Sequence, residues 1–253
     1  AASRQLGNRL GRIERGLRRS WAWMAATLVV LIALVGLREI VRANEGPETG
    51  LAGFPLLSLL LLTPLVGMIA AWRIQRIQTA LTLGLATAGV ELLLTIATLI
   101  RFHPHDPAAQ LVERFEPLPW LSLHLGIDGL GVLFLPLTAL LTLLILLYAQ
   151  TIRRERPGVL VAGVLAQEAA LMGMFTALNL MQFWLFALAE IIPVAFLVWR
   201  WGTSPVRGRA AWRLVRDLSS GLAALLAGIG LLGWNHAAAM DGVWSFELSA
   251  LLA

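Results

Sequence analysis

Residues 129–157 read GLGVLFLPLTALLTLLILLYAQTIRRERP, and this stretch decides the fold class. Between 129 and 149 it contains no charged residue, and it is long enough for a helix to cross the hydrocarbon core of a bilayer. Arg153, Arg154 and Arg156 follow directly. An uncharged stretch of bilayer length that ends at an arginine cluster predicts a transmembrane helix whose last residue faces the cytoplasm.

The rest of the chain repeats this alternation. Of its 253 residues, 58% are hydrophobic and only 14% are charged, too few to cover the surface of a soluble domain of this size. Apolar blocks near bilayer length predict spans at 21–37, 54–71, 79–100, 129–149, 158–176, 180–199 and 218–234. The sequence therefore predicts an all-α integral membrane protein with seven transmembrane helices.

Charge sets the orientation of these helices. The segments 1–19, 72–78, 150–157 and 200–216 are basic. The segments between them, 38–53, 101–128, 177–179 and 235–253, are acidic, mixed or uncharged. By the positive-inside rule, the N-terminus is expected in the cytoplasm and the C-terminus outside, across a bacterial-type inner membrane.

The same pattern suggests four parts. We expect a basic amphipathic arm at 1–20, a transmembrane anchor at 21–43, a six-helix membrane domain at 54–234 and an outer-face tail at 235–253. The first span also resembles a signal peptide. Its apolar stretch is long for one, however, and Arg38 and Glu39 crowd the cleavage site, which favours a retained anchor.

Several classes of function are disfavoured. Cysteine is absent, so no disulfide, thiolate metal site or thiol nucleophile is possible. All 20 basic residues are arginine, and their clustering indicates cytoplasmic loops rather than a nucleic-acid surface. His103, His105 and Asp106 are interpreted as a polar loop rather than a metal site. The sequence contains no phosphate loop, nucleophile–base arrangement or cofactor motif, so no metal, cofactor or nucleic acid is expected.

Two motifs carry a family resemblance. Residues 122–131, SLHLGIDGLG, include Gly126, Asp128 and Gly129, and we expect Asp128 to cap the helix that follows. Residues 175–193, FTALNLMQFWLFALAEIIP, include Asn179 and Pro193 and continue to Trp201-Gly202. From about residue 54 onward the chain resembles the proton-translocating antiporter-like subunits of respiratory complex I, most nearly the M subunit. This family is shared with the Mrp-type cation/proton antiporters, membrane-bound hydrogenases and inorganic-carbon-concentrating complexes.

The resemblance extends over the first six family helices and then stops. The anchor at 21–43 has no counterpart in the family pattern. The resemblance therefore implies a truncated subunit with an added N-terminal helix.

The chain departs from the family where the proton path would begin. The family has a buried glutamate five residues before the motif proline, paired with a lysine two helices later. Here that position is Leu188, and Glu190 lies about 200° further around the helix. The family's aspartate at the helix start is Asn179 here, and the chain contains no lysine. Arginine does not readily release its proton and cannot replace a lysine that must cycle.

Three glutamates remain inside predicted spans, namely Glu91, Glu168 and Glu190. Ionisable residues at mid-membrane are costly, which makes these three the candidates for a proton path. Glu168 and Glu190 lie eleven residues before and after Asn179, so they should have similar depths in adjacent helices. If they meet, repulsion and desolvation would leave a proton shared between them. Alternatively, each is protonated and bonds a partner helix or subunit, and this second interpretation is favoured.

Three functions stay open. The leading one is a truncated antiporter-like subunit, structural or accessory to proton translocation, in a complex I-like or inorganic-carbon-uptake assembly. Its partners would be the lipid bilayer and other membrane subunits, including a full-length antiporter-like homologue. The alternatives are an autonomous proton or cation transporter that uses the three glutamates, and a complex-specific anchor with no role in proton movement. The missing lysine argues against the transporter, and the mid-membrane glutamates argue against an inert anchor.

Overall fold

The structure is a computed structural model that describes residues 55–105, 109–118, 121–151, 155–202, 205–240 and 242–251. The predicted basic arm at 1–20 and anchor at 21–43 lie outside the described residues. The predicted span at 21–37, the total of seven spans and the orientation of the termini therefore remain predictions.

Each of the six spans predicted between 54 and 234 coincides with a helix. The helices are α2 (Leu56–Trp72), α3 (Ile77–Arg101), α4 (Gly131–Ala149), α5 (Pro157–Phe175), α6 (Leu180–Trp201), α7 (Arg207–Ala239) and a short α8 (Leu248–Leu251). Five of them, α3 to α7, are long and apolar enough to cross a membrane, and α2 is an apolar helix of 17 residues. The chain is a multi-pass membrane protein.

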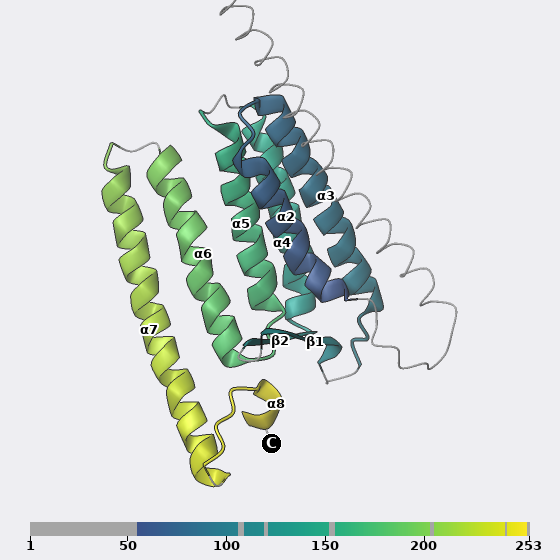
Figure 1. Cartoon of the computed structure of the whole chain (residues 1–253), viewed down its shortest axis with the longest axis vertical. Coiled ribbons are helices and arrows are strands. Elements are labelled where there is room, and N and C mark those ends of the chain that lie inside the picture. Colours follow the sequence, from purple (N-terminus) through teal and green to yellow (C-terminus); the bar gives the residue numbers. More distant parts are fainter. Residues whose placement is uncertain are drawn as a thin grey trace, which may run out of the picture.

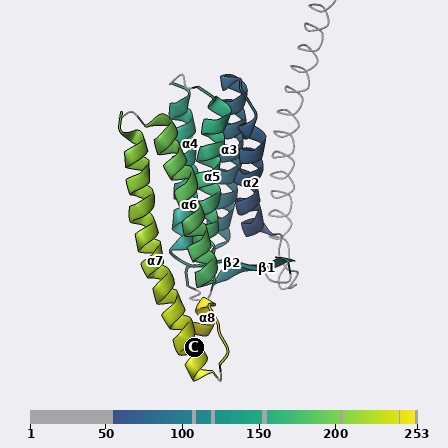
Figure 2. The ribbon, with the colours of Figure 1, turned by 60° about the vertical axis from the view of Figure 1, so that its left-hand side comes forward.

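The helices run up and down beside one another (Figure 1). Helices α2 to α5 form a four-helix unit in which α2 packs closely on α5 and α3 packs on α4. Helix α6 packs on α5, and α7 packs chiefly on α6 at the edge of the bundle, which is clear from both views (Figure 2). The unit α2–α5 is therefore the packed core of the molecule.

Two apolar clusters fill this four-helix unit. The hairpin-side cluster consists of Leu56, Leu57, Leu60, Leu94, Leu125, Ile127, Val132, Leu135, Ala139 and Met172. The loop-side cluster consists of Ala71, Ala80, Leu81, Leu83, Ala88, Leu146, Val161, Ala162, Val164 and Leu165. The clusters occupy opposite halves of the same helices, so a boundary layer separates them within the bundle.

A β-hairpin departs from the all-α prediction. Strands β1 (Gln110–Leu118) and β2 (Leu121–Ile127) pair antiparallel at one end of the bundle, within the segment expected to be an outer loop. Apolar residues at 121, 123, 125 and 127 alternate with other residues, which is the period of a half-buried strand. Leu125 and Ile127 are buried in the hairpin-side cluster, so the hairpin closes that end of the bundle.

The last long helix also differs from its prediction. The sequence predicts a span at 218–234 after a basic loop at 200–216, but α7 begins at Arg207. Hydropathy detects only the apolar half of such a helix. Arginine, alanine and leucine nevertheless have high helix propensity, so the segment stays helical where it becomes polar.

Candidate functional site

Two of the three intramembrane glutamates are fully buried. Glu91 in α3 and Glu168 in α5 each have 0% exposure, and each lies near the middle of its helix. Glu190 in α6 is half-buried. The structure thus separates the three candidates into a buried pair and a third residue at the edge of the core.

Helix geometry brings Glu91 and Glu168 together. A Cβ atom at Gly84 of α3 would lie 2.6 Å from Val161 Cγ1 of α5, so the two helices touch at this level. Glu91 and Glu168 each follow these residues by seven positions, or two turns on the same helix face. The two carboxyl groups interact electrostatically. The Thr142 hydroxyl of α4 lies beside Glu168, outside hydrogen-bond geometry.

Glu190 contacts the chain neighbour of Glu168 rather than Glu168 itself. Glu190 Oε1 accepts a hydrogen bond of 2.8 Å from Gln167 Nε2. Residues 167 and 168 project from α5 about 100° apart, so Gln167 faces α6 while Glu168 faces α3. The equal spacing from Asn179 predicts depth, but it contains no information on which face of α5 is turned to α6.

Glu91 and Glu168 belong to a polar layer, defined here as Thr63, Glu91, Thr142 and Glu168. Each of the four helices α2 to α5 contributes one of its members. All four residues are buried, with exposures of 0 to 5%. Along each helix the polar residue lies between members of the hairpin-side and loop-side clusters, as Glu91 does between Leu94 and Ala88. The polar layer therefore lies at the boundary between the two apolar clusters.

The residues of the first motif shape the start of α4. Asp128 Oδ1 accepts a hydrogen bond of 2.6 Å from the backbone N–H of Gly131, which satisfies one free donor at the helix start. Gly126 lies against the Leu178 side chain, where a Cβ atom would overlap it. Gly129 lies in the turn before the helix, exposed and with ample space. These contacts are structural.

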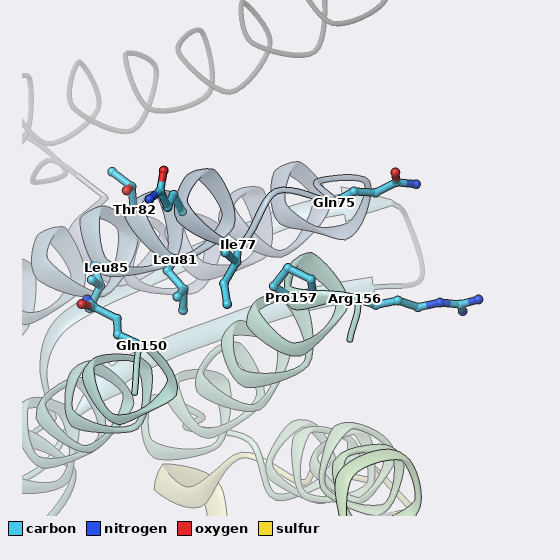
Figure 3. A pocket seen from close by; sticks show the side chains of 9 residues that line it. Gln75, Ile77, Leu81, Thr82, Leu85, Gln150, Arg156 and Pro157 are labelled. Carbon is cyan, nitrogen blue, oxygen red and sulfur yellow. The ribbon is translucent and has the colours of Figure 1, made fainter. Parts of the chain in front are cut away.

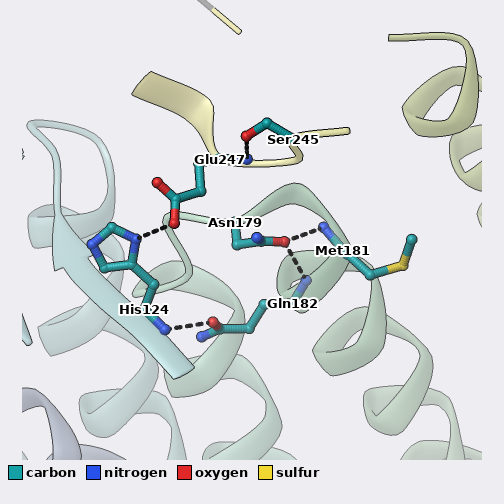
Figure 4. Close-up of polar contacts among 6 residues, drawn as sticks. All are labelled: His124, Asn179, Met181, Gln182, Ser245 and Glu247. Atoms are coloured by element: carbon teal, nitrogen blue, oxygen red, sulfur yellow. Dashed lines mark hydrogen bonds and ion pairs between the residues drawn. The ribbon is translucent and has the colours of Figure 1, made fainter. Parts of the chain in front are cut away.

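The second motif positions α6. Asn179 Oδ1 accepts hydrogen bonds from the backbone N–H groups of Met181 and Gln182, at 2.9 and 3.3 Å, and so caps the helix (Figure 4). Pro193 is buried inside α6. Leu188, at the position where the family resemblance implies a glutamate, is 38% exposed.

A strap made of residues 243–251 crosses the start of α6. The backbone N–H of Leu180 donates to Phe246 O, and that of Leu248 donates to Leu178 O. His124 Nδ1 of β2 lies 3.6 Å from Glu247 Oε1, and the backbone N–H of His124 donates to Gln182 Oε1 at 2.9 Å (Figure 4). The apolar alternation at Trp244, Phe246 and Leu248 suggests a strand or interfacial segment, but this docking was not predicted.

A groove opens at the opposite end of the bundle, between α3, the end of α4 and the start of α5 (Figure 3). Its rim is polar, with Gln75, Gln78 and Gln150, and its deeper residues include Leu81 and Leu85. Leu85 precedes Glu91 by six residues, or about 9 Å along α3. The groove thus approaches the polar layer without reaching it.

Within the described residues, no three His, Asp or Glu side chains gather in a group that could hold a metal ion. The backbone N–H of His103 instead donates to Gln110 Oε1, and Gln110 Nε2 donates back to the His103 carbonyl. Asp106, the third member of that sequence cluster, lies outside the described residues.

Comparison with known proteins places this architecture. No protein-family model matches the chain. F(420)H(2) dehydrogenase subunit M of Methanosarcina mazei is 27% identical over 202 residues, which cover 79% of this chain and 40% of that relative. NADH-quinone oxidoreductase subunit M of Rickettsia conorii is 37% identical over 111 residues, 43% of this chain and 22% of that relative. The chain is thus similar to the M subunits of these complexes.

The fold agrees with this similarity. A chain of respiratory complex I from Thermus thermophilus superposes on the M-subunit-like chain with a TM-score of 0.62 at 26% identity. The match covers 78% of this chain and 38% of that one. The M-subunit-like chain therefore spans well under half the length of the relatives it matches.

Proposed function

We propose that this M-subunit-like chain is an accessory membrane subunit of a proton-translocating assembly in a bacterial-type inner membrane, and that it docks a full-length antiporter-like homologue along α7. The observation that carries the proposal is the free face of α7. This helix packs chiefly on α6, and most of its membrane-spanning part is exposed.

The chemistry of that face fits a partner helix. Gly221 and Gly228 lie seven residues apart on one face of α7, and neither has an atom of another element within 4 Å of where a Cβ would be. Small residues let two membrane helices approach closely, since there is no hydrophobic driving force between helices in lipid. A transmembrane helix of a partner subunit is therefore the occupant proposed for this face.

The residue at the family's glutamate position supports an accessory role. The family pattern has a buried glutamate five residues before the motif proline, and this chain has Leu188 there. The relatives that match it are subunits by name. The alternative of an autonomous transporter gains support from the buried pair Glu91–Glu168, and saturable proton flux by the purified chain in vesicles would favour it.

Substitution on the face of α7 that carries Gly221 and Gly228 tests the proposal. Gly228→Leu fills open space in the isolated chain, so the variant should fold normally but lose the partner subunit on purification in mild detergent, by tenfold or more. Gly89→Leu is the matched control, because Gly89 of α3 also has open space at its Cβ position. It should retain the partner. Equal recovery of the partner with both variants would exclude α7 as the docking helix.

A further inference from the structure

Several buried polar atoms of the polar layer lack a hydrogen-bond partner. Thr63 Oγ1, both carboxyl oxygens of Glu91 and both of Glu168 are buried without a hydrogen-bond partner among the described residues. Buried polar groups in native proteins are nearly always hydrogen-bonded, and an exception needs an explanation such as a proton, a water or an ion. Five of the ten such atoms among the described residues lie in this one layer, and four of them are carboxyl oxygens.

The surroundings supply no positive charge. In α2 to α5, the described charged or titratable side chains other than Glu91 and Glu168 are Arg101 and Tyr148, which lie at helix ends. From α6, Glu190 is engaged by Gln167 on a different face of α5. Two adjacent carboxylates, both desolvated and with no cation beside them, would repel each other strongly. The layer must therefore contain a proton that relieves this repulsion.

We propose that Glu91 and Glu168 form a proton-binding site that holds one proton between two carboxyl groups, with the hydroxyls of Thr63 and Thr142 as its neighbours. One carboxylate takes up H⁺ and becomes a carboxylic acid, whose O–H donates to the carboxylate of the other residue. The site needs no lysine. It belongs to the unit α2–α5 and does not depend on docking at α7.

The groove indicates the end from which the proton arrives. Toward the arginine-bearing loops, the groove ends at Leu85, about 9 Å from Glu91 along α3. Toward the hairpin, the hairpin-side cluster fills the bundle beyond Leu94, and the Thr98 hydroxyl bonds the Leu94 carbonyl of its own helix. The groove therefore opens the bundle on the side of the arginine loops, and we expect the site to exchange its proton with that side.

A membrane-permeant carbodiimide tests the site directly, because this reagent modifies protonated carboxyl groups in apolar surroundings. The intact chain in detergent or vesicles should take up one label, found by mass spectrometry on Glu91 or Glu168. Labelling should fall as the pH is raised. Exposed Glu155 should stay unmodified, and Glu190→Gln should leave the labelling unchanged.

Variants sharpen the test. In Glu91→Gln the label should appear on Glu168, in Glu168→Gln it should appear on Glu91, and the double variant should take up none. Absence of label from both residues in the folded wild-type chain would overturn the proposal without any variant. Protection by sodium ions would also overturn it, since the pair would then hold a cation instead of a proton.

Discussion

At the scale of single residues, two neighbours in α5 have different environments. Gln167 donates to Glu190 of α6, whereas Glu168 turns inward to Glu91 of α3. The family resemblance implies a glutamate at the position of Leu188, which is exposed here, and the acidic residue of α6 is Glu190, two positions later. Glu190 is thus part of the contact between α5 and α6 rather than part of the buried pair.

This contact leads to a prediction for Glu190. Glu190→Gln keeps the shape and can still bond Gln167, so stability and assembly should change little. Glu190→Leu removes the acceptor and should destabilise the chain by about 1 kcal/mol. Thermal unfolding in detergent measures both variants. A Glu190→Gln complex that assembles fully but does not translocate protons would contradict this view and make Glu190 a proton carrier.

At the scale of elements, a side chain of the hairpin caps α2, the first described helix of the bundle. Glu113 of β1 accepts hydrogen bonds from the backbone N–H groups of Leu57 and Ser58, at 2.7 and 2.8 Å, and from the Ser58 hydroxyl at 2.7 Å. These amides are free donors at the start of α2, where the helix dipole also favours a negative charge. A carboxylate distant in sequence therefore caps a helix whose own preceding residue, Pro55, makes no side-chain cap bond.

Removal of this cap gives the prediction at this scale. Glu113→Ala should cost about 1–3 kcal/mol, because partly buried donors lose a charged acceptor. Hydrogen exchange should rise first at Leu57 and Ser58, the two amides that the carboxylate bonds. Glu155→Ala is the control, since the Glu155 side chain is 84% exposed and should tolerate the change. Equal exchange in both variants would mean that the cap does not hold the end of α2.

At the scale of the whole molecule, the loops divide by charge. The hairpin, the start of α6 and the strap lie at one end of the bundle, and the links that follow α2, α4 and α6 lie at the other. Arg73, Arg76, Arg156 and Arg207 are on this second end. This arrangement agrees with the charge alternation of the sequence, which places the second end in the cytoplasm.

Reporter fusions test that orientation. A reporter fused after Pro205 should behave as cytoplasmic, and one fused after Leu251 should behave as external. The matched pair brackets a single helix, α7, so a change of side between the two fusions also establishes that α7 crosses the membrane. An external signal at Pro205 would invert the orientation of every described helix.

The sequence by itself determined the membrane class, the positions of six helices and the similarity to M subunits. These properties depend on local quantities, namely the length of apolar runs, the charge of the links and two continuous motifs. It also identified Glu91, Glu168 and Glu190 as the acids inside the membrane, because an ionisable residue within an apolar run is visible without a fold.

Only the tertiary structure decided which of these acids meet. The pairing of Glu91 with Glu168 depends on how α3 and α5 are rotated about their axes, and a rotation of about 100° would have presented Gln167 in place of Glu168. The Glu113 cap and the strap likewise join residues far apart in the chain. Lipid surrounds an apolar helix equally well on every face. The sequence of such a helix therefore predicts its depth in the membrane but not its rotation about its own axis. Packing between helices determines that rotation.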